Sequence, residues 1–171
     1  MDFINHTRVL KWITPLILLW LAACASTISP EVLKDVDQNI RFEALLKNPD
    51  AFQGKTVLFG GDIIKTENYP DKTLILVFQL SLNSDKKPIG RDRSAGRFIV
   101  SVPGFLDPAI FQPGRQITVV GVVAGKEVRP LDDIDYTYPV IERRHFYLWQ
   151  RESAIDAKPR VYFGFGVGVG R

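Results

Sequence analysis

The stretch Thr56-Val-Leu-Phe-Gly-Gly-Asp-Ile-Ile-Lys65 decides the fold expected for this chain. Its β-branched and aromatic residues are typical of a strand, and the pair Gly60-Gly61 in its middle predicts a bulge or a sharp bend. A strand that bends in its middle can pair on both of its sides, as the first strand of a small barrel must. The stretch therefore predicts a curled sheet.

Four further segments have strand character. Residues 72–82 alternate strictly, which predicts that one face of this strand points into the core, namely Leu74, Leu76, Phe78 and Leu80. The other segments are residues 97–102, 116–124 and 138–149, the last with an interruption near Arg143-Arg144, and residues 128–135 are expected to be a connection.

Two short helices complete the expected elements. Residues 40–46 predict an N-terminal helix that ends at Asn48-Pro49. A second helical turn is expected at residues 107–111, between the third and fourth strands, with Asp107 as N-cap and Pro108 at the first helical position. This order predicts an all-β fold, a small five-stranded OB-like Greek-key barrel, with an open sandwich as the alternative. Five strands are fewer than the minimum of about eight in a membrane-spanning barrel.

The N-terminus has the layout of a secretory signal peptide. Arg8 and Lys11 precede an uncharged run of ten residues, 12–21, and small residues close it. Ten residues rise only about 15 Å as a helix, half of the ~30 Å hydrocarbon core, so a permanent transmembrane helix is not expected. The segment Leu21-Ala-Ala-Cys24 holds the only cysteine of the chain and looks like a bacterial lipobox. We therefore predict that residues 1–23 are removed and that Cys24 is lipidated.

The processed chain divides into three parts. Residues 24–38 are expected to be the lipidated N-terminus and a tether, residues 39–151 the barrel domain, and residues 152–171 a Gly-rich mobile tail. Ala25 and Ser26 follow the lipidated position. In bacterial lipoproteins an Asp directly after the cysteine tends to retain the protein at the inner membrane. Because this chain has Ala25 at that position and not Asp, we predict that it is transported to the outer membrane.

Several motifs, taken in order, carry a resemblance to a known family. Besides the lipobox they are Phe59-Gly-Gly-Asp-Ile63, Gly104-Phe-Leu-Asp-Pro108, Gly114 with Thr118-Val-Val-Gly121, Tyr138-Pro-Val-Ile-Glu142 and Tyr147-Leu-Trp149. Together they resemble the Slp family of outer-membrane lipoproteins, named for a starvation-inducible member. The resemblance implies a small β-barrel domain anchored at the outer membrane without an established catalytic activity.

The sequence holds few groups for catalysis or metal binding. His145 is the only histidine after residue 23, and its place in a strand favours a structural role over that of a catalytic base. The acidic cluster Asp132, Asp133 and Asp135 lacks the spacing of a calcium loop, and Cys and His are too few for a zinc site. We predict no catalytic residue, no metal and no cofactor. The formal net charge of +3 is too small to indicate a nucleic-acid partner.

The C-terminal strand mixes basic and aromatic residues, and Arg143, Tyr147 and Trp149 are the candidate binding surface. The expected function is that of a non-enzymatic outer-membrane lipoprotein, whose barrel is a structural or interaction module facing the periplasm, with envelope proteins as partners. The alternative is a periplasmic binding module for a glycan or another extended polymer. A hydrolase has little support, because no nucleophile–base pair is visible.

Overall fold

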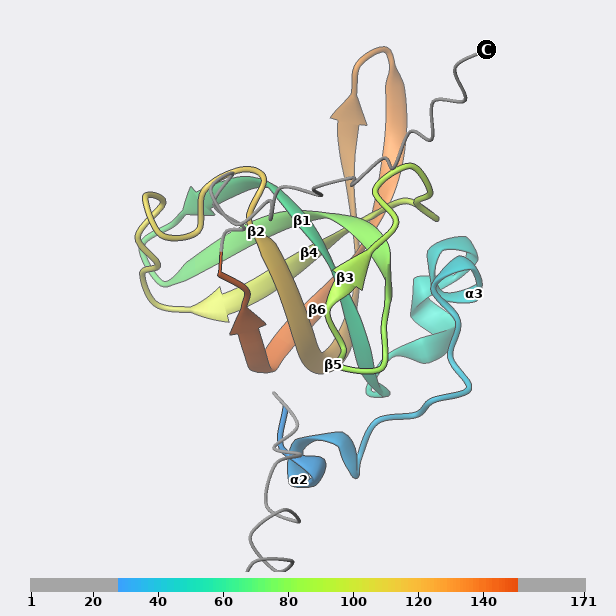
Figure 1. Ribbon diagram of the computed structural model, residues 1–171. Coiled ribbons are helices and arrows are strands. Elements are labelled where there is room, and N and C mark those ends of the chain that lie inside the picture. The colour runs from blue at the N-terminus through green and yellow to red at the C-terminus, as the bar shows by residue number, and fades with distance from the viewer. Residues whose placement is uncertain (1–27, 151–171) are drawn as a thin grey trace, which may run out of the picture.

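In a computed structural model, which describes residues 28–150, five long strands form a closed β-barrel (Figure 1). The strands are hydrogen-bonded in the order β1-β5-β6-β4-β2, and β1 also pairs with β2, which closes the ring. The pairing of β4 with β6 is parallel and the others are antiparallel. The predicted all-β, OB-like Greek-key barrel is confirmed. Its strands are β1 (Thr56–Asn68), β2 (Lys72–Leu82), β4 (Arg97–Pro103), β5 (Gln116–Leu131) and β6 (Ile134–Leu148).

The glycine pair of β1 lies where this strand contacts both neighbours. Gly60 and Gly61 pair with β2 on one side and with β5 on the other. A Cβ atom on Gly61 would collide with the carbonyl oxygen of Phe78. The glycines therefore allow the close approach that closes the barrel, while the bulge itself lies further along, between Ile63 and Lys65.

The interior is filled by apolar side chains from all five strands. Phe98 is fully buried, and its ring centroid lies 5.8 Å from that of Phe42 and 6.3 Å from that of Phe59. Phe42 comes from α3 (Phe42–Lys47), which covers one end of the barrel and also buries Leu45. The expected N-terminal helix is thus present, and it is followed by a 3-10 turn, η2 (Pro49–Phe52).

The inward face of β2 is the opposite of the predicted one. Ile75 and Val77 belong to the interior cluster. Leu74 is instead packed in a second cluster with Ile99 and Tyr138, and Leu76 lies partly buried against it. Phe78 is half-buried and Leu80 fully buried. The prediction failed because β2 is apolar on both faces: its leucines alternate as expected, but the β-branched Ile75 and Val77 on the other face point into the barrel.

The last two strands extend beyond the barrel as a hairpin, drawn in orange in Figure 1. Pairing continues from the barrel to Leu131 and Ile134, and Asp132, with a φ of 53°, forms the tight turn. Residues 128–135 are therefore hairpin arms and not the expected connection. The predicted interruption of the last strand is present, because the register shifts where Val120 pairs with His145 and Gly121 with Arg143.

In place of the short helix predicted between the third and fourth strands, the structure has a hydrogen-bonded turn at residues 108–110. The side chain of Asp107 accepts a hydrogen bond of 2.8 Å from the backbone N–H of Ala109, as an N-cap does. Ile110 and Phe111 both donate backbone N–H groups to the carbonyl oxygen of Asp107. Pro113 and Gly114, the latter with a φ of 81°, then turn the chain into β5, so a helix does not form here.

The first described residues pack on the barrel. Ile28 is only 2% exposed, and Ser29 caps the short helix α2 (Pro30–Leu33). The backbone N–H of Asp37 donates to the carbonyl oxygen of Thr56 at 2.9 Å. Within residues 24–38, the predicted tether, Ile28 is thus buried and Asp37 is bonded to β1, while the side chains of residues 29–38 are exposed or half-buried. The predicted signal peptide, the predicted lipidation and sorting residues Cys24, Ala25 and Ser26, and the predicted Gly-rich tail lie outside the described residues.

Candidate functional site

OB-like barrels bind oligonucleotides and oligosaccharides on the outer face of their second and third strands, which here are β2 and β4. In this protein that face is covered. Leu74, Ile99 and Tyr138 are buried there, at 6%, 0% and 2% exposure. Arg129 of the hairpin reaches β1, where its Nη1 lies 2.7 Å from Glu67 Oε2. Tyr136 and Tyr138 of β6 thus cover part of this face.

Charged groups form a network at this contact. The carboxylate of Glu67 accepts bonds from Lys65, at 2.8 Å, and from Arg129, while Arg129 also donates to Glu127 at 2.7 Å. The hydrogen bond from Lys65 is the largest cause that lowers the pKa of Glu67, and the same bond raises the pKa of Lys65. These pKa shifts follow from ion pairs within the protein, because Glu67 and Glu127 are each paired with at least one cationic side chain.

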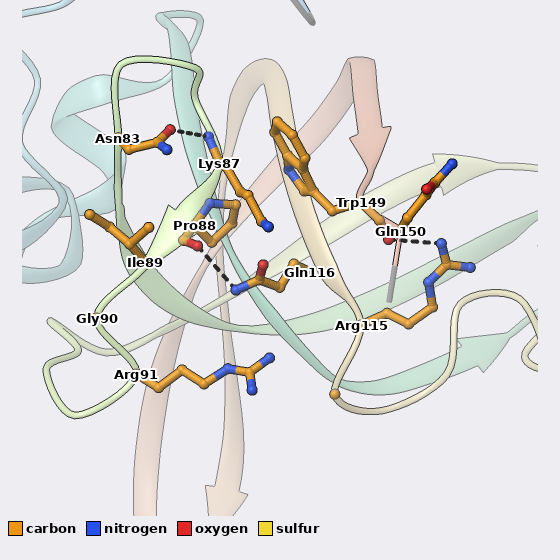
Figure 2. A pocket seen from close by; sticks show the side chains of 11 residues that line it. Asn83, Lys87, Pro88, Ile89, Gly90, Arg91, Arg115, Gln116, Trp149 and Gln150 are labelled. Carbon is orange, nitrogen blue, oxygen red and sulfur yellow. Dashed lines mark hydrogen bonds between the residues drawn. The ribbon is translucent and has the colours of Figure 1, made fainter. Parts of the chain in front are cut away.

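An open cleft of about 680 Å³ lies elsewhere, between the loop that follows β2 and the point where β5 begins and β6 ends (Figure 2). One wall is the segment from Asn83 to Arg91, which includes the two-residue strand β3 (Pro88–Ile89). The other wall is formed by Arg115, Trp149 and Gln150. The cleft is within the usual size range of small-ligand sites.

Hydrogen bonds hold the first wall in place. Asn83 Oδ1 accepts from the backbone N–H of Lys87 at 2.9 Å, and Lys86 adopts a positive φ of 65° in the turn between them. The carbonyl oxygen of Lys86 accepts from the buried Thr118 Oγ1 at 2.6 Å. Gln116 Nε2 donates to the carbonyl oxygen of Pro88 across the floor of the cleft (Figure 2). The loop is therefore tied to β5 at two points.

The second wall is fixed by its own contacts. Trp149 Nε1 donates to Thr118 Oγ1 at 2.9 Å, and the ring of Tyr147 packs against the indole with centroids 4.6 Å apart. Arg115 donates from Nη2 to the carbonyl oxygen of Trp149 and from Nη1 to that of Ile110. Both the indole and the guanidinium are thus oriented before any ligand arrives.

The cleft is rich in cations and hydrogen-bond donors. Lys87, Arg91 and Arg115 line it, together with the amides of Asn83, Gln116 and Gln150, and among residues 28–150 no carboxylate lines it. The Lys87 ammonium lies 5.9 Å from the centroid of the Trp149 ring. Arg91 pairs with Asp62 of β1 at 2.8 Å. Such a set can hold an anionic group and a planar or hydroxylated body beside it.

The residues predicted as a binding surface are only partly brought together. Trp149 lines the cleft and Tyr147 packs against it, whereas Arg143 lies over Phe146, 5.6 Å from its centroid. Phe146 contacts the interior cluster, so Arg143 points to the other face of β6. A register shift at Arg144 separates them, which alternation along the sequence cannot reveal.

The cations of the cleft were missed in the sequence. Lys87, Arg91 and Arg115 come from two loops, and the polar composition of residues 83–94 by itself indicates no more than a loop. Their one visible signal is the run of basic residues at Lys86, Lys87, Arg91 and Arg93. Spacing along the chain did not indicate that this run faces Arg115 and Trp149.

The other candidate groups lie apart from the cleft. His145 borders a small hollow of about 200 Å³ beside α2, and Asp132 and Asp133 sit at the hairpin tip. Within residues 28–150, no three His, Cys, Asp or Glu side chains converge in a way that suits a metal ion. The helices of this same part of the chain are too short or too polar to cross a membrane.

In a comparison with known protein families, residues 21–167 match the model of the Outer membrane lipoprotein Slp family. An uncharacterised protein of Haemophilus influenzae is 38% identical over 103 residues, covering 60% of this chain and 56% of that protein, so the match spans little more than half of its length. The uncharacterised lipoprotein YeaY of Escherichia coli is 25% identical over 144 residues, covering 83% and 73% of the two chains. The outer membrane protein Slp of Escherichia coli is 25% identical over 150 residues, covering 85% and 78%.

Proposed function

Because the chain belongs to the Slp family of outer membrane lipoproteins, we propose that its barrel is a non-enzymatic interaction module held at the periplasmic face of the outer membrane. The observation that carries this proposal is the contrast between a filled interior and an open cleft on the outside. Phe42, Phe59 and Phe98 occupy the barrel, whereas Lys87, Arg115 and Trp149 border the cleft. Charged, hydrogen-bonding and aromatic groups such as these are the kinds that hold partners in known binding sites, which supports the proposal.

The start of the packed domain limits how far the barrel can stand from its anchor. Lipidation at Cys24 would leave four peptide units before the buried Ile28. Four residues span at most about 14 Å when fully extended. The barrel would therefore lie close to the bilayer surface, with the α2 side nearest to it, and not about 20 Å away as a free tether of a dozen residues would allow.

The anchor is tested with labelled palmitate in cells that express the full chain. Wild type should incorporate the label and fractionate with the outer membrane, while Cys24→Ser, which lacks the thiol nucleophile, should do neither. Ala25→Asp should keep the label but shift towards the inner membrane. Label on Cys24→Ser would contradict the anchor, and trypsin digestion of the barrel in intact cells would contradict the periplasmic face.

The interaction role is tested by placing a photoreactive residue at Ile89, which lines the cleft and is 47% exposed. Illumination of intact cells should give an adduct of constant mass at this position. The same residue at Ile134, which is 61% exposed on the hairpin, serves as the control. Equal yields at both positions, or none at Ile89, would contradict a cleft-centred interaction.

A further inference from the structure

A second hollow, of about 240 Å³, lies between the chain that follows α2 and the outer side of β1. Four half-buried apolar side chains line it, namely Leu33, Val36, Ile40 and Leu58. The hollow is smaller than the ~300 Å³ at which sites for small ligands usually begin. It therefore suits a slender apolar chain, or part of one, and is too small for a bulky ligand.

The wall of this hollow is held to the barrel by its own hydrogen bonds. The backbone N–H of Asp37 donates to the carbonyl oxygen of Thr56 at 2.9 Å, and that of Ile40 donates to the carbonyl oxygen of Asp37 at 3.4 Å. Asp37 is the one carboxylate among the lining residues within 28–150, and its Oδ1 accepts from the backbone N–H and from the side-chain amide of Asn39. The acid is thus engaged within its own segment.

Lys86 borders the hollow from the loop after β2 and has an unusual backbone conformation. Its φ of 65° lies in the left-handed region that favours glycine. The turn is held there because Lys86 N–H donates to the carbonyl oxygen of Asn83 at 3.0 Å and its own carbonyl oxygen accepts from Thr118 Oγ1 at 2.6 Å. Within the described part of the chain, the ammonium of Lys86 forms no ion pair. A lysine at this position therefore supplies a cation to the rim of the hollow at a cost in backbone strain.

The hollow lies close to the expected membrane anchor. Leu33 is the last residue of α2, and the buried Ile28 just before this helix is four residues after Cys24. The anchor proposed above would hold this side of the barrel within about 14 Å of the bilayer surface, because four extended residues reach no further. The apolar chains available to the hollow are then those of membrane lipids.

We propose that the hollow takes up part of one acyl chain of a phospholipid from the membrane that anchors the protein, while Lys86 pairs with the phosphate of its head group. The proposal rests on the anchor in the proposed function and adds a second membrane contact, separate from the cleft at Trp149. An acyl chain that enters the hollow stays in apolar surroundings, while the half-buried side chains lose contact with water. The phosphate gives Lys86 a charge-assisted hydrogen bond.

A photoreactive lipid tests this contact on the lipidated chain. The protein is reconstituted in vesicles of phosphatidylethanolamine and phosphatidylglycerol, with a trace of phosphatidylglycerol that carries a diazirine at the end of one acyl chain. After illumination and proteolysis, mass spectrometry should find adducts on residues 33–40 and on the peptide that contains Leu58. The hairpin around Val128, which is 56% exposed, should carry few adducts and serves as the internal control.

A charge placed in the hollow should exclude the acyl chain. Val36→Glu introduces a carboxylate among the apolar lining residues and should reduce the adducts at Leu58 by about tenfold. Val128→Glu makes the same change on the exposed hairpin and should leave the yield within about twofold of wild type. Circular dichroism confirms that both variants are folded.

Lys86→Gly separates lipid binding from stability. Glycine adopts a φ of 65° without steric cost, so the melting temperature should not fall. The adduct yield should nevertheless fall by about threefold, because the phosphate loses its cation. Lys72→Gln removes a charge from the exposed start of β2 and should leave the yield unchanged.

The possible failures of this proposal and of the anchor are distinguishable. If palmitate labels Cys24 but wild type forms no adduct at the hollow, the lipid contact is wrong and the anchor stands. If palmitate does not label Cys24, the anchor itself is wrong. Equal yields in wild type and Val36→Glu would contradict entry into the hollow, and an unchanged yield in Lys86→Gly would contradict the phosphate contact.

Discussion

The inner and outer faces of strands β2, β4 and β6 both carry buried apolar residues, yet these residues are buried in different ways and to different extents. The inner face, with Ile75, Val77 and Val100, is enclosed by the barrel itself. The outer face, with Ile99 and Tyr138, lies beneath side chains of the hairpin and its neighbours. Burial of the inner face follows from closing the ring, whereas the outer face also depends on contacts such as Arg129 to Glu67, which join distant parts of the chain.

The largest effect is expected inside the barrel. Phe98→Ala removes a fully buried ring between Phe42 and Phe59 and should lower the free energy of unfolding by about 3–5 kcal/mol. Urea denaturation followed by circular dichroism measures the loss. Phe105→Ala, at a side chain that is 72% exposed, is the control and should change stability by less than about 0.5 kcal/mol. Similar losses in both variants would mean that the interior is not uniquely packed.

Neighbouring positions on β2 compare the two faces directly. Ile75→Ala opens a cavity in the interior and should cost about 2–5 kcal/mol. Leu76→Ala acts on the half-buried outer face and should cost only about 1 kcal/mol. The same denaturation experiment separates them, and a larger loss for Leu76→Ala would reverse the assignment of the faces.

The smallest effect concerns the contact that fastens the hairpin. The hydrogen bonds from Lys65 and Arg129 lower the pKa of Glu67 below 4.5 in the folded chain. The ionised carboxylate therefore adds stability above pH 4.5, and this contribution is lost as the pH falls through the lower, folded pKa. Glu67→Gln should cost at most about 1 kcal/mol at pH 7, and the difference from wild type should shrink in acid.

The control for this pH dependence is Glu43→Gln, which removes a carboxylate from the exposed side of α3. Unfolding free energies measured at pH 7 and at pH 3.5 provide the comparison. A Glu67→Gln deficit that stays constant across this range would show that the ion pairs do not act through the charge of Glu67.

The sequence supported the barrel more firmly than the site. Gly60 and Gly61 pointed to a strand shared by two neighbours, and Asp107 with Pro108 pointed to a capped turn, because these residues act through local backbone geometry. The binding surface of Arg143, Tyr147 and Trp149 was predicted from one strand, and the register shift at Arg144 separates Arg143 from the other two. Trp149 was found in this way, while Arg91 and Arg115 lie in loops whose meeting no local pattern records.

By itself, the sequence determined the order of the strands along the chain and the positions of the turns, since glycine, proline and capping residues constrain only their own neighbourhood. Only the tertiary structure decided which face of β2 fills the barrel. Both faces carry apolar residues, so the choice depends on which side chains fit the volume left by Phe42, Phe59 and Phe98. The tertiary structure also determines where the cleft forms. Lys87 and Trp149 are far apart along the chain, and they come together only when the closed sheet brings the segments that carry them against β5.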